Sequence, residues 1–318
     1  MTISHTLPRL RPLAGVLAIV QVPFAADDRI EETDLRREVD WIFATGADGL
    51  GTGMVSEIVR LSAAERQWLA ERLVELAAGR GPVFASVGAE SAAVAREHAR
   101  FAERAGCDAV MAVPPMTARL PAARIVDYFR EIAESVSLPV IVQDASAYVG
   151  QSIPHQACVE LLDRYGPEKI LFKPEAAPLG PSLSALRDAT EGRARIFEGS
   201  GGILLVDSYR RGIVGTMPAA DLLDAVVAVW RALRAGDDES AYAVSLPLSA
   251  LVVLEMQSGL DGFLEIEKHL LVKRGLFRSA RRRGPVGWTL DVETAAEVER
   301  LFARLSAAVA AQGGPQSR

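Results

Sequence analysis

Short, continuous runs of apolar residues alternate along the chain with longer segments in which apolar residues recur every three to four positions. The continuous runs predict strands that are buried on both faces, and the longer segments predict helices with one apolar face. The predicted strands are 15–20, 49–51, 83–87, 109–113, 140–143, 170–172, 195–197 and 213–216. The predicted helices between them include 32–43, 63–78, 91–105, 122–135, 155–165 and 183–189.

Local signals support several of these helix starts. Ser62 precedes Glu65 by three residues, which is the spacing of a capping box in which each residue satisfies a free N–H of the other. Pro154 and Pro181 stand near the first turns of two further helices, where the missing N–H of proline removes no helical hydrogen bond.

Eight strands that alternate with helices over the first 220 residues predict an α/β fold, a (β/α)8 TIM barrel, because an open doubly wound sheet usually has fewer strands. After residue 220 the alternation stops, and four helices are predicted in succession, at 220–235, 239–257, 263–274 and 294–311. We therefore expect a barrel core over 1–220, the last barrel helix and a C-terminal helical extension over 221–312, and a frayed tail over 313–318.

Composition narrows the functional class. The chain has 318 residues, 49% hydrophobic and 24% charged, which is typical of a globular protein and excludes disorder. A net charge of -6 argues against nucleic acid or an acidic membrane as partner, so we expect a small-molecule substrate. No apolar run approaches the ~20 residues of a membrane span, and the first eleven residues carry no secretory signal. We therefore expect a cytoplasmic protein.

Cysteine and histidine usage argues against structural disulfides and metal sites. Cys107 and Cys158 are the only cysteines, too few for a disulfide framework or a four-cysteine zinc site. The four histidines are isolated along the chain, and no two have the spacing of a metal-binding pair. We expect no metal.

Lys173 is the strongest candidate for a catalytic residue, since the active site of a TIM barrel lies at the carboxyl ends of its strands. It ends a predicted strand and is one of only four lysines, with Lys169, Lys268 and Lys273. A desolvated lysine amine can attack a carbonyl carbon and form a Schiff base, which arginine cannot do. Alternatively, Lys173 forms a structural ion pair with Glu175.

Other residues after strands allow a chemical and a structural interpretation. Glu57 could be a general base or could bind backbone N–H groups, and Ser56 could bind a substrate carboxylate or cap a helix. Asp144 and Gln143 could orient a substrate hydroxyl or stabilise their own loop. The glycine-rich segment 198–202 could bind phosphate or could form a tight turn.

Taken together, these positions resemble the dihydrodipicolinate synthase / N-acetylneuraminate lyase superfamily of lysine-dependent (β/α)8 enzymes. The resemblance extends from residue 15 to residue 305 and is carried by 22–24, 56–57 with 61–66, 113–115, 138–140, 172–173 and 212–216. It implies that Lys173 forms a Schiff base with the keto carbon of a 2-oxo acid. Because this covalent imine activates the substrate, we expect no cofactor. It also implies a homo-oligomer, a tetramer or a dimer.

The chain departs from the usual motifs of that superfamily. Only Ser56 remains as a hydroxyl where two usually bind the substrate carboxylate, and Gln143 with Asp144 replaces a Tyr-Asn pair. Met116 stands where a tyrosine usually relays protons, and a thioether has no proton to give. The segments 56–57, 142–145, 172–175 and 215–217 are more similar to the branch that contains 2-keto-3-deoxyarabonate dehydratase.

The leading hypothesis is a Schiff-base lyase that acts on a 2-oxo acid. The preferred reaction is the dehydration of a 2-keto-3-deoxy sugar acid. The expected catalytic residues are Lys173, Glu175 and Asp144, and the expected substrate-binding residues are Ser56, Glu57, Met116, Gln143, Gly199, Gly215 and Thr216. Candidates to replace the missing tyrosine are, in order, Glu175, Asp144, Tyr148 and a water held by Ser56.

Three alternatives stay open. The first is a pyruvate-dependent aldolase or synthase, and the second is a 2-oxo acid binding protein without activity. The third is a barrel that acts on a phosphate-bearing substrate through Ser200 and Gly201.

Overall fold

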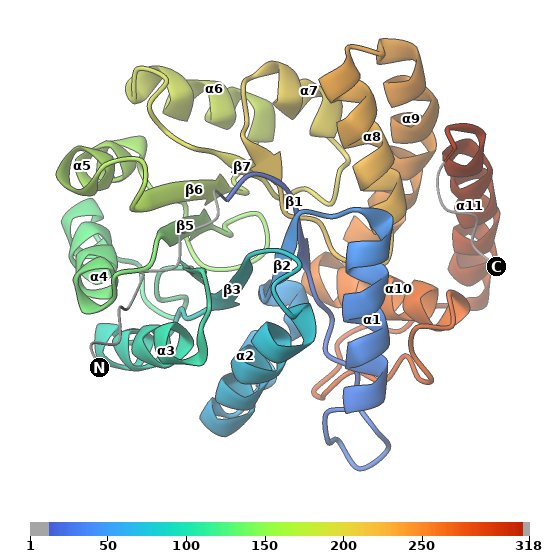
Figure 1. The fold of residues 1–318 in the computed structure, drawn as a ribbon, viewed down its shortest axis with the longest axis horizontal. Helices are drawn as coiled ribbons and strands as arrows, with labels where there is room; N and C mark the ends of the chain where they lie inside the picture. Colours follow the sequence, from blue (N-terminus) through green and yellow to red (C-terminus); the bar gives the residue numbers. More distant parts are fainter. Residues whose placement is uncertain (1–12, 314–318) are drawn as a thin grey trace, which may run out of the picture.

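The computed structural model describes residues 13–313, which form a parallel eight-stranded barrel surrounded by helices (Figure 1). The strands are β1 (Gly15–Ile19), β2 (Gly49–Gly51), β3 (Val83–Ser86), β4 (Ala109–Ala112), β5 (Val140–Asp144), β6 (Ile170–Pro174), β7 (Phe197–Glu198) and β8 (Gly215–Thr216). They pair in the order β6-β5-β4-β3-β2-β1-β8-β7. A parallel bridge between Phe172 and Ile196 joins β6 to the start of β7 and closes the barrel. The predicted TIM barrel is confirmed.

Alternation along the strands divides the core into two layers. Leu17 and Ile19 of β1 point into the barrel with Phe84, Met111 and Phe197. The intervening strand residues pack outward against the helices in a separate, larger apolar cluster. Both faces of every strand are therefore buried, which is why the strands are continuous apolar runs in the sequence.

The helices around the barrel are α1 (Glu32–Thr45), α2 (Ala63–Ala77), α3 (Ala92–Ala105), α4 (Ala122–Ser135), α5 (His155–Tyr165), α6 (Leu179–Ala189), α7 (Leu205–Arg210) and α8 (Leu223–Ala235). The capping box of α2 is present, because the Ser62 side chain accepts from Glu65 N and the Glu65 carboxylate accepts from Ser62 N.

Two helices differ from the prediction. α6 begins four residues before the predicted 183, because Gly180 and Pro181 lie in its first turn, where proline's missing N–H removes no helical bond. α7 was not predicted. Its six residues form fewer than two turns, too few for a helical period to be recognised in the sequence.

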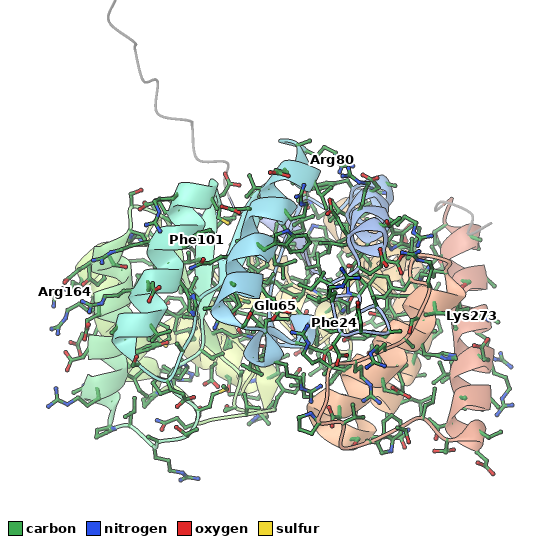
Figure 2. The ribbon with its side chains drawn as sticks, turned by 90° about the horizontal axis from the view of Figure 1, so that it is seen from below. Phe24, Glu65, Arg80, Phe101, Arg164 and Lys273 are labelled. Atoms are coloured by element: carbon green, nitrogen blue, oxygen red, sulfur yellow. The ribbon has the colours of Figure 1, made fainter. Side chains whose placement is uncertain are left out.

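The predicted C-terminal helical extension is also present, as α9 (Asp238–Glu255), α10 (Gly259–Lys273) and α11 (Val292–Ala311). α9 packs against α8 and α11, and α10 contacts the single turn η1 (Met54–Ser56) beyond β2. Arg164 in α5 and Lys273 in α10 lie toward opposite ends of the molecule (Figure 2). The division at residue 220 stays a prediction, and most of the predicted tail 313–318 lies outside the described residues.

Residues 238–273 are long and apolar enough to cross a membrane by length and composition alone. They form two packed helices joined by a short turn, η3 (Met256–Ser258). Core helices of soluble proteins meet the same criterion, so this feature does not decide where the protein resides.

Candidate active site

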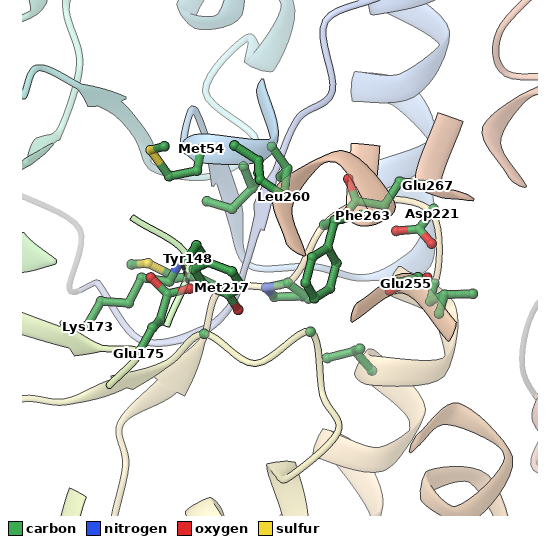
Figure 3. Close-up of a pocket in the computed structure, with 18 of the residues that line it drawn as sticks. Met54, Tyr148, Lys173, Glu175, Met217, Asp221, Glu255, Leu260, Phe263 and Glu267 are labelled. Atoms are coloured by element: carbon green, nitrogen blue, oxygen red, sulfur yellow. Dashed lines mark ion pairs between the residues drawn. The ribbon is translucent and has the colours of Figure 1, made fainter. Parts of the chain in front are cut away.

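Lys173 lies at the carboxyl end of β6, inside a cavity at the mouth of the barrel (Figure 3). Its side chain is buried, with 5% exposed, and its Nζ lies 3.2 Å from Glu175 Oε1. Gln143, on the neighbouring strand β5, donates from Nε2 to Glu175 Oε2 over 2.5 Å. The structure thus brings together three residues that the sequence predicted for the site.

Glu175 is placed to exchange a proton with Lys173. Burial raises the pKa of the Glu175 carboxyl, and the nearby Lys173 ammonium opposes that rise. A proton can therefore move between the amine and the carboxylate over one short contact. Such a pair of groups is what general acid–base catalysis requires.

Gly199, immediately after β7, lies directly against this pair. A Cβ atom at residue 199 would lie 2.5 Å from Lys173 Cε and 2.6 Å from Glu175 Oε1. Both distances are far below van der Waals contact, so a side chain here would displace the lysine or the carboxylate. Gly199 was predicted to bind substrate, and it lines the cavity.

On the Schiff-base hypothesis from the sequence, we expect Gly199→Ala to slow imine formation about 100-fold, because displacing a reacting group by about 1 Å can cost that much. The measurement is the rate at which borohydride traps a pyruvate adduct on the protein. Gly284→Ala serves as the control, since a Cβ at residue 284 meets no atom within 4 Å. An unchanged trapping rate in Gly199→Ala would contradict the close packing described here.

Tyr148, in the loop after β5, also lines the cavity. Its ring packs edge-on against Phe263 of α10, with 5.6 Å between the ring centroids. Burial, and then the negative charge of Glu175, raise the pKa of the Tyr148 phenol. The phenol therefore keeps its proton at neutral pH and faces the cavity as a donor.

Ser56 does not line the cavity, in contrast to its predicted role in substrate binding. Its Oγ donates to the Val20 carbonyl over 2.5 Å and accepts from Gly53 N over 3.0 Å. The hydroxyl is therefore occupied in tying the turn η1 to the end of β1. Met54 and Val55, the two residues before it, line the cavity instead.

Glu57 is likewise absent from the cavity wall, contrary to prediction. Its Oε1 pairs with Lys268 Nζ of α10 at 2.5 Å, and its Oε2 accepts from Arg283 N at 2.9 Å and from Arg60 at 3.2 Å. The carboxylate joins the barrel to the C-terminal helices, which is the structural interpretation of this residue.

Asp144 was predicted as a proton carrier, but it lies outside the Lys173 cavity. Its oxygens accept from Ile153 N at 2.7 Å, Ser146 N at 3.0 Å and the Ser152 hydroxyl at 3.1 Å. The carboxylate is used to hold the β5–α5 loop and borders a separate cavity.

Met116, a predicted substrate-binding residue, is also not part of the cavity wall. Its backbone N–H donates to Glu90 Oε1 at 3.0 Å, and its side chain lies beside Gly150. The β4–α4 loop therefore holds this residue away from Lys173.

Gly215 and Thr216 on β8 were predicted to bind substrate, and neither lines the cavity. A Cβ at Gly215 would lie 2.2 Å from the Gly15 carbonyl oxygen, so glycine is needed for β8 to pair with β1. The Thr216 hydroxyl donates to Glu198 Oε2 at 2.5 Å. Both residues are part of the barrel wall.

The glycine-rich segment 198–202 is organised by its own carboxylate. Glu198 Oε1 accepts from Ser200 N at 2.6 Å and from the Ser200 hydroxyl. A negative charge thus occupies the donors that a phosphate would need at Ser200. This arrangement disfavours a phosphate site at Ser200 and Gly201.

Sequence reasoning missed three acidic residues of the cavity, Asp221, Glu255 and Glu267 (Figure 3). Asp221 lies five residues beyond β8, and the two glutamates belong to α9 and α10. The rule that places a barrel's active site at the carboxyl ends of its strands selects residues directly after strands, and it does not select residues of the C-terminal helices. A usable signal was present, because Glu255 directly follows the apolar run 250–254.

Within residues 13–313, no group of three or more His, Cys, Asp or Glu side chains has an arrangement that could hold a metal ion.

Similarity to known proteins extends over nearly the whole chain. The model of the dihydrodipicolinate synthetase family matches residues 12–303. L-2-keto-3-deoxyarabonate dehydratase from Azospirillum brasilense is 29% identical over 317 residues, covering 96% of this chain and 97% of that protein. A probable 2-dehydro-3-deoxy-D-pentonate aldolase from Escherichia coli is 30% identical over 48% of this chain and 51% of its own length. Dihydrodipicolinate synthase from Rhodopseudomonas palustris superposes with a TM-score of 0.83 at 28% identity, covering 92% of this chain and 97% of its own.

Proposed function

The chain belongs to the dihydrodipicolinate synthetase family, and on that basis we propose that it is a Schiff-base lyase that dehydrates a 2-keto-3-deoxy sugar acid. The observation that carries this proposal is the buried Lys173–Glu175 pair at the carboxyl end of β6. The similarity to a 2-keto-3-deoxyarabonate dehydratase along nearly the whole chain supports the choice of reaction.

In the proposed mechanism, Glu175 takes a proton from Lys173, and the neutral amine attacks the C2 carbonyl carbon of the substrate. Glu175 then returns this proton to the C2 oxygen, which becomes a hydroxyl group. Glu175 next carries a second proton from the attached nitrogen to that hydroxyl, so that the oxygen leaves as water and the protonated iminium forms. The positive iminium makes the C3 proton acidic. Glu175, again a carboxylate, accepts that proton while the C4 hydroxyl departs.

Tyr148 is the proposed donor to the departing C4 hydroxyl, which leaves as a second water. It replaces the tyrosine that is missing at Met116, and it was third among the candidates from sequence. Its position on the cavity wall and its protonated phenol support this role over the structural Asp144. Hydrolysis of the product imine then restores Lys173, so the covalent imine takes the place of a separate cofactor.

We expect Tyr148→Phe to lower kcat by about 100-fold to 10,000-fold, the usual contribution of a positioned proton donor. Borohydride trapping of pyruvate on Lys173 should persist, because imine formation uses Glu175 and not the phenol. Tyr242→Phe, which alters an exposed tyrosine of α9, is the control. If Tyr148→Phe keeps the kcat of the native enzyme, another group supplies the proton.

Product analysis separates this proposal from its alternatives. Dehydration of a 2-keto-3-deoxypentonate retains all five carbons and removes one water, whereas aldol cleavage of the C3–C4 bond yields pyruvate and a shorter aldehyde. Mass spectrometry of the reaction mixture distinguishes the two. Pyruvate and aldehyde as the products would favour the aldolase alternative, and an adduct without any product would favour a non-catalytic binding protein. Assembly into a homo-oligomer and a cytoplasmic location stay predictions.

A further inference from the structure

The cavity that contains Lys173 extends beyond Phe263 to a second group of polar side chains (Figure 3). Asp221 and Glu255 at this far end are 2% and 3% exposed, and Glu267 of α10 is 2% exposed. All three line the same cavity as Lys173. We call these three residues the acid wall.

Asp221 and Glu255 hydrogen-bond to each other through their side chains. Asp221 Oδ2 and Glu255 Oε1 are buried, and in the described part of the chain no residue outside this pair donates a hydrogen bond to either oxygen. Glu267 is better satisfied, because its Oε2 accepts from Gln21 Nε2 at 3.0 Å. One hydrogen bond shared by two carboxyl groups leaves acceptor capacity unused, and unused buried acceptors are costly, so the far end of the cavity can receive donors from a ligand.

The two cations whose charges act on Asp221 and Glu267, Arg274 and Lys268, are engaged elsewhere. Lys268 directs its donors to Glu57 Oε1 and to two backbone carbonyls. Arg274 forms a bidentate ion pair with the Asp224 carboxylate, and its Nε–H donates to the backbone oxygen of Asp221. Neither cation donates to the side-chain oxygens of the acid wall.

Burial and mutual repulsion keep protons on the acid wall. Burial raises the pKa of Asp221 to about 6 against the opposing effect of Arg274. Burial, and then the neighbouring Asp221 charge, raise the pKa of Glu255. A partly protonated wall presents both O–H donors and oxygen acceptors, a combination that matches alcohol groups.

We propose that the acid wall binds the hydroxyl groups at the end of the substrate farthest from its keto carbon, and that it excludes substrates in which that end is phosphorylated. Hydroxyls can both donate to and accept from the Asp221–Glu255 pair, to which no other described residue donates through Asp221 Oδ2 or Glu255 Oε1. A phosphate would bring a double negative charge into this buried region, where Lys268 and Arg274 are engaged elsewhere, and burial of a charge without a partner is costly. This inference rests on the proposed function, since it concerns the same substrate.

The test uses borohydride trapping on Lys173 as a binding measurement, with three probes. Pyruvate has no distal chain, 2-keto-3-deoxygluconate has a neutral hydroxylated chain, and its 6-phosphate has the same skeleton with an anionic end. The protein variants are Asp221→Asn, the double variant Asp221→Asn with Glu255→Gln, and Glu239→Gln as an exposed control on α9. Thermal unfolding and circular dichroism verify that each variant is folded.

We expect 2-keto-3-deoxygluconate to reach half-maximal trapping at a concentration about tenfold or more below that of its 6-phosphate. The double variant should raise that concentration for 2-keto-3-deoxygluconate about tenfold, with the pyruvate value unchanged. The single variant Asp221→Asn should shift it in the same direction.

Equal trapping of the phosphorylated and neutral probes would overturn the inference. So would a double variant that shifts pyruvate and 2-keto-3-deoxygluconate by the same factor, because the acids would then act only on the fold. Tighter trapping of a cationic probe, 2-oxo-5-guanidinopentanoate, would also overturn it and assign the wall to a positive group. Absence of any pyruvate adduct in the native protein would instead overturn the proposed function, and with it the inference.

Discussion

Replacing Lys173 with alanine is expected to abolish the reduced adduct that borohydride fixes on the protein in the presence of pyruvate or a 2-keto-3-deoxy sugar acid. It should also reduce turnover by about 1,000-fold or more, because the covalent route through the imine is lost. The measurement is intact-protein and peptide mass spectrometry after borohydride treatment, together with kcat. The adduct in the native protein should map to the peptide that contains residue 173.

Lys273→Ala is the matched control for this experiment. Lys273 lies on α10 beside α11, with its side chain 37% exposed and paired to Glu299, so its loss should leave the adduct intact. An adduct that persists in Lys173→Ala and maps to Lys169 would contradict the proposed site. Absence of adduct with both compounds in the native protein would favour a barrel without Schiff-base chemistry.

Replacing Lys268 with methionine is expected to lower the free energy of unfolding by about 3–5 kcal/mol, which is the usual cost of removing one partner from a buried ion pair. The Lys268 ammonium is fully buried, and it donates to Glu57, to the Val22 carbonyl and to the Arg281 carbonyl. It also lies 4.6 Å from the centroid of the Phe24 ring. Methionine fills the space but leaves the buried Glu57 carboxylate with Arg60 as its remaining cation, at 3.2 Å, so its charge is no longer fully compensated.

Urea denaturation measures this effect, with exposed Lys273→Met as the control. Adding Glu57→Gln to Lys268→Met removes the uncompensated charge, so the double variant should lose less stability than the two single variants combined. A loss below about 1 kcal/mol in Lys268→Met would be typical of a solvent-exposed pair, and would contradict the burial described here. The Schiff-base experiment and this one are independent, because Lys268 does not line the Lys173 cavity.

The fold could be predicted because most strands contain a short apolar run and all but β7 are followed by a helix long enough to show a period, so the local pattern agrees with the topology of a barrel. Lys173 could be predicted for a similar reason. In a TIM barrel the end of a strand determines where its last side chain lies, and Lys173 is the last but one residue of β6. Glu175 and Gln143 follow from the same rule, since β5 and β6 are neighbours.

Residues on turns and loops could not be placed in this way. Whether Ser56 and Glu57 face the cavity depends on partners far away in the chain, namely the Val20 carbonyl and Lys268. No local pattern indicates that Lys268, 211 residues away, will satisfy the carboxylate of Glu57. The acid wall was missed for the related reason that α9 and α10 contribute to the cavity from outside the strand–helix repeat.

The pairing between β6 and β7, which we call the β6–β7 joint, predicts how the stability of the barrel depends on a bound ligand. Within the described residues, one isolated bridge between Phe172 and Ile196 links these strands, whereas β5 and β6 share five paired positions. Lys173 and Glu175 lie on one side of this joint and Gly199 on the other, and all three line the same cavity, so a substrate bound as proposed would contact both strands. A molecule that binds the closed barrel but not the opened one adds its binding free energy to the stability of the whole domain. On the proposed function, occupancy of the site and the stability of the barrel are therefore coupled, and a bound substrate would reinforce the least paired edge of the sheet.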